Sequence, residues 1–469
     1  MVVGEMPEGV DLLVIGGGPG GYTAALEAAA LGRSVTLIDA DGVDGLGGTC
    51  LLHGCIPSKG LIELADVRSK TRDLAPGALS VPAVDLGAFQ TWKSSMVTGL
   101  SHGVASRLKA ASVDVVTGRF MFTGPRRGVA EKGGDHPPQH YEFNDAIIAT
   151  GSRAIEVPPL PFSHPLIHDA SSLLDLDSLP EALVVVGGGY IGIELGTALA
   201  KLGSTVTIVE ALDTILPNAP AHASRLVARR AEELGIEILT GHSAVGVTDE
   251  GITIESAAGQ RRIPADAILV AVGRRPTTND LGLAEAGITT SPDGLIPVDP
   301  TGRAGKHIAA IGDVVAGPAL AHKATAEAKV AAASVSGRND RMISTVIPQV
   351  MFSDPEIAIA RIEPGLGEPP AAGTTTKHKL PLGFSGRATT MGQTNGYVEI
   401  EIETATDAIV SAVAVGPHSS ELISEMVLAI EMGASAQDLT LSIHPHPTLS
   451  EMWPDAVAFH TPAHSQPTA

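Results

Sequence analysis

A glycine-rich turn between a strand and a helix occurs twice in this chain and constrains its fold more than any other feature. The first copy follows the apolar run Val10 to Ile15, places glycines at 16, 18 and 21, and leads into an Ala-rich stretch, 22–31, that we expect to be helical. A second apolar run then ends in Asp39. Strand, glycine turn, helix and acid-terminated strand form the pattern of a dinucleotide-binding βαβ unit, in which glycine lets backbone N–H groups approach a pyrophosphate.

The same unit recurs further along the chain. Apolar residues 183–186 are followed by Gly187, Gly189 and Gly192, an expected helix through Leu202, and a strand that ends in Glu210. One such match is weak evidence, whereas two in the same local context predict that the chain binds two dinucleotides.

The segments around the two units predict further strands and helices. Residues 123–141 are polar and contain proline, which indicates an exposed hairpin or loop before the apolar strand 146–151. A strand at 267–276, ended by glycine and proline, and another at 307–311 precede an expected helix at 321–334.

The pattern changes near Ile347. Alternating strands at 397–402 and 409–415 and a helix near 421–432 indicate a separate α+β domain. The length of 469 residues fits about three domains. The polar tail after Thr461 is expected to fray.

Charge and hydropathy argue against two classes of partner. A net charge of −21 repels phosphate backbones, so nucleic acid is not expected. No apolar stretch approaches the roughly 18 residues of a membrane span, and the first nine residues carry Glu5 and Glu8 without a targeting pattern. We expect a cytoplasmic protein, in which paired cysteines are more often catalytic than structural.

The two cysteines of the chain, Cys50 and Cys55, lie in one short segment. A structural disulfide across so short a loop would constrain the unfolded chain little. Two thiols do not complete a four-ligand zinc site, so no metal is expected. A redox-active dithiol is the remaining interpretation. A regular helix separates residues i and i+5 by about 7.5 Å along its axis, beyond the reach of about 7 Å for a disulfide. The segment must therefore be distorted, with Gly54 and Pro57 available to shape it.

These motifs make the chain resemble the flavin-dependent pyridine nucleotide–disulfide oxidoreductases, and most closely the dihydrolipoamide dehydrogenases, the E3 components of 2-oxo acid dehydrogenase complexes. The resemblance runs from about Val10 to Trp453. Besides the two glycine turns, it is carried by these segments: Gly47–Lys59, Thr150–Gly151, Gly273–Pro276, Ile311–Asp313 with Pro318–Ala324, and His444–Glu451.

The resemblance implies FAD at the first glycine turn and NAD at the second. The implied FAD contacts are Gly16, Gly18, Gly21, Asp39, Gly48, Thr49, Lys59, Phe120 through its backbone, Thr150, Gly151, Ser152, Asp313, Ala319, Leu320, Ala321 and His322. The implied NAD contacts are Gly187, Gly188, Gly189, Tyr190, Ile191, Gly192, Glu194, Glu210, Ala244 and Gly273. Glu210 favours NAD over NADP, because a carboxylate bonds the ribose hydroxyls and repels a 2′-phosphate.

The resemblance also implies the architecture. It is an α/β fold with two Rossmann-like dinucleotide-binding domains and a C-terminal α+β dimerisation domain. We expect residues 1–152 and 276–346 to form the FAD-binding and central domain, 153–275 the NAD-binding domain and 347–469 the interface domain.

The implied reaction is the oxidation of dihydrolipoamide with reduction of NAD⁺. Cys50 exchanges with the substrate dithiol and Cys55 faces the flavin, while His446 acts as base and Glu451 orients its ring. In the family the histidine and glutamate come from the other subunit, so a homodimer is implied. The implied partners are a lipoyl domain and the E2 component of a 2-oxo acid dehydrogenase complex, or the glycine cleavage carrier protein.

Four further residues complete the expected site. Lys59 is expected near the flavin and paired with Glu194, because a buried lysine needs a partner to stay charged. Tyr190 resembles the aromatic residue that covers the nicotinamide pocket, although packing explains it equally well. His444 is expected to tune the site.

Departures from the family pattern leave alternatives open. Leu52-His53 lies between the cysteines, Asp39 stands where Glu is usual, and Met452-Trp453 departs from the usual helical continuation after the catalytic glutamate. A glutathione or mycothiol disulfide reductase is the nearest alternative, and Glu210 argues against the NADP-dependent glutathione enzymes. A noncatalytic flavoprotein scaffold is the alternative from another class, and the intact cysteines argue against it.

Overall fold

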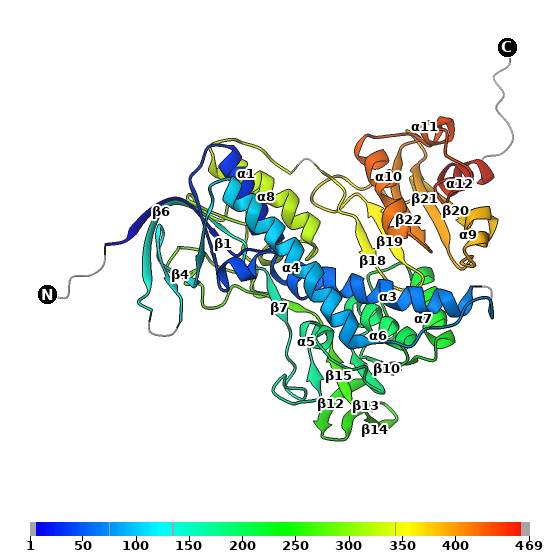
Figure 1. The fold of residues 1–469 in the computed structure, drawn as a ribbon. Helices are drawn as coiled ribbons and strands as arrows, with labels where there is room; N and C mark the ends of the chain where they lie inside the picture. The colour runs from blue at the N-terminus through cyan, green and yellow to red at the C-terminus, as the bar shows by residue number, and fades with distance from the viewer. Residues whose placement is uncertain (1–5, 75, 134–135, 343, 461–469) are drawn as a thin grey trace, which may run out of the picture.

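The computed structural model describes residues 6–74, 76–133, 136–342 and 344–460. Figure 1 shows a first layered unit that contains β1, β6, α1 and α8, a second unit around β10 and β15, and a third around β18 to β22 that includes α12. The predicted fraying of the tail after Thr461 falls outside the described residues.

The first unit is a sheet with helices on one face. Its parallel part has the order β3–β2–β1–β6, with β17 also parallel to β6. Its elements are β1 (Glu8–Ile15), α1 (Pro19–Ala30), β2 (Val35–Asp39), η1 (Gly42–Gly45), α2 (Gly48–Leu52), α3 (Cys55–Asp73), α4 (Leu86–Ala110), β3 (Asp114–Thr117), β4 (Arg119–Gly124), β5 (Arg127–Glu131), β6 (Gln139–Ile148), β17 (Ile308–Ala310), η2 (Gly312–Val314) and α8 (Ala321–Val335).

Small side chains let α1 and α8 pack closely against each other and the sheet. Ala24 and Ala28 of α1 and Ala328 and Ala331 of α8 are fully buried in one apolar cluster with Leu12 of β1. Figure 1 shows α1, α8 and α4 together beside β1. The alanine-rich composition of both segments therefore reflects a close helix contact as well as helix propensity.

The interpretation of residues 123–141 is partly wrong. A hairpin is present, because β4 and β5 pair antiparallel, but β5 also pairs with β6 and so belongs to the sheet. It is not wholly exposed, since Ala130 is buried in an aromatic cluster with Phe120, Phe122 and Phe143. The sequence does not indicate β5, because its flanks are polar and proline-rich and it has too few apolar residues to show the alternation of a strand.

The second unit repeats the parallel architecture. Its strand order is β11–β10–β9–β15–β8, all parallel, and the antiparallel order β12–β13–β14 covers one face. Its elements, with the link β7–β16, are β7 (Ser152–Ala154), β8 (Ile167–His168), α5 (Ala170–Leu174), β9 (Ala182–Val186), α6 (Tyr190–Leu202), β10 (Thr205–Glu210), α7 (Ala221–Glu233), β11 (Glu237–Thr240), β12 (Ser243–Thr248), β13 (Gly251–Ser256), β14 (Gly259–Pro264), β15 (Ala267–Val270) and β16 (Arg274–Pro276).

The single strand predicted at 267–276 is two strands. Gly273, with a φ of 127°, turns the chain after β15, and β16 then pairs antiparallel with β7. These two short strands run side by side where the chain enters and leaves the second unit.

The third unit is the predicted α+β region. Its antiparallel order is β18–β19–β22–β21–β20, with α10 and α12 packed on it around Trp453. Its elements are β18 (Gln349–Met351), β19 (Ile357–Arg361), β20 (Thr375–Pro381), η3 (Leu382–Phe384), α9 (Gly386–Thr390), β21 (Tyr397–Glu403), β22 (Ile409–Val415), α10 (Ser419–Glu431), α11 (Ala436–Leu441) and α12 (Met452–His460). Helix α12 begins directly after Glu451 despite Pro454, because proline is tolerated in a first helical turn.

Both glycine turns have the same backbone contact. A Cβ atom on Gly21 would lie 1.8 Å from the carbonyl oxygen of Gly16, and one on Gly192 would lie 2.1 Å from that of Gly187. Each third glycine therefore lets its helix start directly against the preceding strand, which is the packing role expected of that position.

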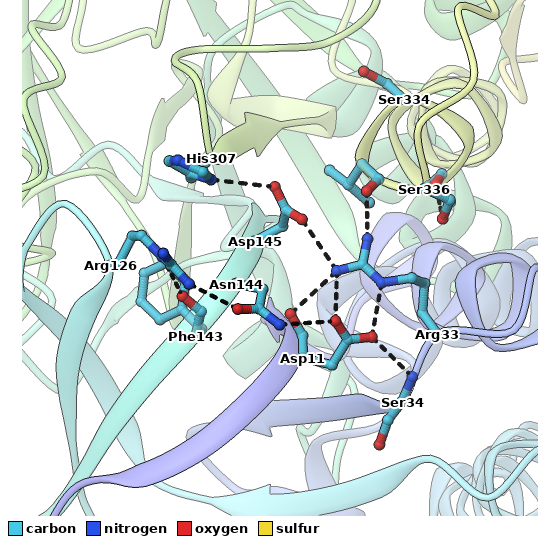
Figure 2. A network of polar contacts seen from close by, with 12 residues as sticks. Asp11, Arg33, Ser34, Arg126, Phe143, Asn144, Asp145, His307, Ser334 and Ser336 are labelled. Atoms are coloured by element: carbon cyan, nitrogen blue, oxygen red, sulfur yellow. Dashed lines mark hydrogen bonds and ion pairs between the residues drawn. The ribbon is translucent and has the colours of Figure 1, made fainter.

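A polar network ties the first unit together on the side away from its glycine turn (Figure 2). Arg33, which follows α1, pairs with Asp11 of β1 at 2.8 Å and with Asp145 of β6 at 3.1 Å, and it donates to the carbonyl of Val335 at the end of α8. Asn144 also donates to Asp11. One partly buried guanidinium therefore joins two strands and two helices.

Among the described residues, no helix is both long enough and apolar enough to cross a membrane.

Candidate active site

The first glycine turn, the cysteine segment and the start of α6 surround one cavity of about 380 Å³. The predicted FAD-site residues that line it are Gly16, Gly18, Asp39, Gly48, Thr49, Lys59, Thr150, Gly151, Ser152, Asp313, Ala319 and Ala321. Both cysteines and His53 lie in its wall, as do Tyr190, Ile191 and Glu194 from the second glycine turn and its helix. The cavity thus brings together segments more than 250 residues apart in the sequence.

Several predicted contacts lie outside the cavity lining. Gly21 is buried behind the turn, Leu320 precedes α8, and the ring of His322 bonds the carbonyl of Pro348 at 2.8 Å. The side chain of Phe120 packs in the core against Phe122, with ring centroids 5.0 Å apart. The remaining predicted NAD-site residues also lie outside it: Gly187, Gly188, Gly189, Gly192, Glu210, Ala244 and Gly273.

The cysteine segment is bent as predicted. Cys50 lies in α2, Cys55 is the first residue of α3, and His53 and Gly54 separate the two helices. A Cβ atom on Gly54 would lie 2.9 Å from the carbonyl oxygen of Thr49, so the close approach at this break requires glycine. The bend brings two residues together that one continuous helix would hold apart.

The two sulfur atoms differ in their electrostatics. Both cysteines are free thiols, and the Cys50 thiol donates a hydrogen bond to Cys55. This bond, with the positive charge of Lys59, lowers the pKa of Cys55 to about 7, against the opposing effect of burial. The same bond, together with burial, raises the pKa of Cys50. At neutral pH the pair therefore holds a thiol at position 50 and a substantial fraction of thiolate at position 55.

The predicted ion pair beside the cysteines is present. The Nζ of Lys59 lies 2.8 Å from Oε2 of Glu194, whose side chain is 4% exposed. The other carboxylate oxygen accepts the backbone N–H of Phe352 at 2.8 Å, and Lys59 lies 4.7 Å from the centroid of the Phe352 ring. Glu194 therefore fixes the Lys59 side chain at the cavity wall.

The acids at the ends of β2 and β10 hold equivalent positions. Asp39 accepts the N–H of Gly17 at 2.7 Å, and Glu210 accepts the N–H of Gly188 at 2.6 Å. β12 begins beside Glu210, whose carbonyl accepts the N–H of His242. Each acid therefore lies against its own glycine turn, as a ribose-binding carboxylate must.

Arg274 is a cavity residue that the sequence reasoning missed. It donates to the hydroxyl of Ser152 at 2.8 Å, and that hydroxyl donates to Asp313 at 2.5 Å. The segment Gly273–Pro276 carries part of the family resemblance, but the sequence alone does not distinguish its arginine as a site residue. The chain of bonds links the start of β16 to the start of η2 across the cavity.

The predicted turn around the C-terminal histidine is also present. Nδ1 of His446 lies 2.8 Å from Oε1 of Glu451, and the other carboxylate oxygen accepts the N–H of Thr448 at 2.7 Å. The hydrogen bond from the Thr448 backbone lowers the pKa of Glu451 most, and the bond from His446 lowers it further. The His446 side chain is 82% exposed and is not part of the cavity wall. His444 instead bonds Glu425 of α10 at 2.8 Å.

Comparison with known proteins identifies this arrangement. Residues 10–328 match the family model described as pyridine nucleotide-disulphide oxidoreductase, and residues 347–457 match the model of its dimerisation domain. The chain belongs to the pyridine nucleotide-disulphide oxidoreductase family. It is an oxidoreductase with FAD and NAD(H) as cofactors, and it forms a homodimer through its C-terminal region.

Relatives aligned over nearly the whole chain indicate which enzymes of this family the chain is most similar to. Dihydrolipoyl dehydrogenase 2 of Haloarcula marismortui is 42% identical over 468 residues, 98% of each chain. The dihydrolipoyl dehydrogenases of Geobacillus stearothermophilus and Bacillus subtilis are 41% and 39% identical, over 99% of each chain. Within its family the chain therefore groups with the dihydrolipoyl dehydrogenases.

Solved structures share the whole fold. LpdA of Mycobacterium tuberculosis superposes with a TM-score of 0.87 at 27% identity, covering 97% of this chain and all of that one. The Cu(II) complex of RclA, a HOCl-induced flavoprotein disulfide reductase from Escherichia coli, gives 0.85 at 25% identity with the same coverage.

The cavity fits a flavin dinucleotide. A Cβ atom on Gly48 would lie 2.8 Å from Cα of Gly18. The absence of side chains at these two glycines therefore leaves space in the cavity beside Asp39. Gly18 is the N-cap of α1, whose N-terminus favours the negative charge of a pyrophosphate. The sulfur pair and Lys59 then lie in the same cavity as this nucleotide cradle.

Proposed function

We propose that the chain oxidises dihydrolipoamide to lipoamide with reduction of NAD⁺, and that Cys50 and Cys55 are its redox dithiol. The observation that carries the proposal is the thiol–thiolate pair beside the Lys59–Glu194 ion pair, in a cavity bordered by the first glycine turn and the start of α6. Dithiol exchange needs one sulfur for the substrate and a second that leaves easily as thiolate.

The exchange is a pair of sulfur displacements. His446 takes the proton of the first substrate thiol, and that sulfur attacks Cys50 of the oxidised protein, which breaks the Cys50–Cys55 bond and releases Cys55 as thiolate. The second substrate thiol then attacks the bonded lipoyl sulfur and forms lipoamide, and its proton passes to the departing Cys50. The lowered pKa of Cys55 makes it the better leaving group. FAD, when bound, takes the electron pair of the dithiol and supplies hydride to NAD⁺.

His446 of one subunit serves the cysteines of the other. Glu451 accepts from Nδ1, which leaves Nε2 as the basic nitrogen. The exposure of this imidazole in a single chain and its position in the dimerisation region support the shared site. Lys59 and Glu194 stay within one subunit and hold the flavin side of the cavity.

The nucleotide contacts and domain boundaries expected from the sequence complete the proposal. The first glycine turn would hold FAD with Asp39 at its ribose, and the second would hold NAD with Glu210 at its ribose. The FAD-binding and central domain comprises residues 1–152 and 276–346. The NAD-binding domain comprises residues 153–275, and the interface domain residues 347–469. Glu210 predicts NAD over NADP.

The natural substrate is a lipoyl group on a carrier domain, and the partner is the E2 component of a 2-oxo acid dehydrogenase complex or the glycine cleavage carrier. The location is the cytoplasm, where a cysteine pair stays reducible. A lipoyl arm fits the proposal because Cys50 lies in the cavity wall on α2, a short helix at the protein surface.

Steady-state rates with dihydrolipoamide, glutathione disulfide and mycothiol disulfide test the proposal side by side. We expect turnover with dihydrolipoamide and NAD⁺, and little with NADP⁺ or either disulfide. Cys50→Ser should retain FAD and lose turnover. A preference for glutathione or mycothiol disulfide would overturn the assignment.

A further inference from the structure

Helices α3 and α6 are joined by two ion pairs with the same spacing. Lys59 of α3 pairs with Glu194 of α6 at 2.8 Å, and Asp66 of α3 pairs with Lys201 of α6 at 2.6 Å. Seven residues separate the members of each helix, which is two turns and about 10.5 Å along the axis. Both pairs therefore lie on the contact stripe of two parallel helices, which run side by side in Figure 1.

The two ion pairs have opposite polarity, so they fit in one register. The lysine belongs to α3 in the first pair and to α6 in the second. A slide of two turns would place lysine against lysine or carboxylate against carboxylate, which is unfavourable. A register shift in which each side chain takes the place of its neighbour turns the stripe by about 100° and breaks both pairs.

One short segment of the third unit contacts both ion pairs. The backbone N–H of Phe352 donates to Glu194, and the carboxylate of Asp354 lies 2.8 Å from Nζ of Lys201. Arg230 of α7 also pairs with Asp354, at 3.1 Å. The Lys201 side chain is 7% exposed, and its two carboxylate partners raise its pKa in spite of burial, so it is charged at neutral pH.

We propose that Lys201, held by Asp66 and Asp354, is a positioning residue for the flavin side of the active site. It acts through the helix register, because α3 begins with Cys55 and carries Lys59, while α6 carries Glu194 and Tyr190. The charge of Lys59 lowers the pKa of Cys55 and that of Glu194 raises it. A small shift of α3 against α6 therefore changes the thiolate at Cys55 although Lys201 touches neither sulfur nor cofactor.

The test measures Cys55 directly and rests on the proposed function only in its kinetic arm. In a Cys50→Ser background Cys55 is the single cysteine, and serine retains a hydroxyl donor toward it. The rate of alkylation by iodoacetamide against pH then reports the Cys55 thiolate in the FAD-loaded dimer. Asp66→Asn removes the ion pair between Lys201 and α3 but retains the ion pair between Lys201 and Asp354. The buried lysine therefore keeps a carboxylate partner in this variant.

We expect Asp66→Asn and Lys201→Met to raise the alkylation midpoint by about one pH unit, a tenfold loss of thiolate below the midpoint. With both cysteines present, kcat should fall about tenfold while KM for dihydrolipoamide stays constant, since the substrate meets Cys50. Arg33→Met is the control, because it removes a partly buried ion pair far from the cysteines and should leave both quantities unchanged.

An unchanged alkylation midpoint in both variants, with Arg33→Met as reference, would overturn the positioning role. Equal shifts in all three variants would also overturn it, because they would report a general loss of stability. A wild-type protein without dihydrolipoamide turnover would refute the proposed function and leave the alkylation result valid.

Discussion

The chemistry at the residue scale depends on one hydrogen bond and one charge. The Cys50 thiol and the Lys59 ammonium act on the same sulfur, and Glu194 holds the ammonium in place. The motif around the cysteines predicts that these residues take part. The separation into thiol and thiolate depends on the bend at Gly54, which a sequence motif does not specify.

The thiolate at Cys55 should form as the pH rises through about 7. Its pKa is lowered to about 7, so the protein in its dithiol form is mainly thiol below this value and mainly thiolate above it. The long-wavelength charge-transfer absorbance of the reduced, FAD-loaded protein measures this fraction. Lys59→Met should move the midpoint upward, because a favourable charge is lost. A midpoint near the ordinary value of about 8.5 in the wild type would contradict this account.

His446→Gln should lower kcat/KM for dihydrolipoamide by about 10²- to 10⁴-fold, the usual contribution of a general base. His444→Gln is the matched control, because His444 bonds Glu425 and not Glu451. Its effect should be small. Steady-state kinetics at fixed pH compare the two variants, and equal losses would mean that His446 is not the base.

At the scale of elements, the two βαβ units were predictable because glycine spacing and apolar runs are local signals. β5 and β16 were not, since each is short and is defined by the strand that it pairs with. The pairing of Lys59 with Glu194 was predicted from the family pattern. The second pair, Asp66 with Lys201, was not, because only the packing of α3 on α6 brings it together.

Gly21→Ala should yield protein that lacks FAD. An added Cβ would lie 1.8 Å from the backbone oxygen of Gly16, so α1 must move away from the strand and the nucleotide cradle opens. The flavin absorbance of purified protein, before and after incubation with FAD, measures the loss. Gly99→Ala in α4 is the control, because a Cβ there meets nothing within 4 Å. Full flavin content in Gly21→Ala would contradict the close-approach argument.

At the scale of the whole molecule, the Arg33 network stabilises the first unit independently of catalysis. Arg33→Met leaves Asp11 without a guanidinium and Asp145 with that of Arg303 alone, and it should lower the free energy of unfolding by about 1–3 kcal/mol, since the pairs are partly solvated. Chemical denaturation at pH 7 measures it.

The stabilisation should also depend on pH. Arg33 holds the pKa of Asp11 below its usual 3.8. A depressed carboxyl pKa stabilises the fold fully above the unfolded value and loses this contribution as the pH falls through the folded value. The difference between wild type and Arg33→Met should therefore shrink below about pH 4. A difference that stays constant into acid would show that packing, and not charge, accounts for it.

The central claim is that the cysteines of one subunit work with His446 of the other, and subunit complementation tests it most directly. Cys50→Ser and His446→Gln homodimers should each be inactive. Co-refolding them in equal amounts gives about half heterodimers, each with one intact site, so about a quarter of wild-type turnover should return. Heterodimers that form but show no turnover above the parent variants would contradict the shared site.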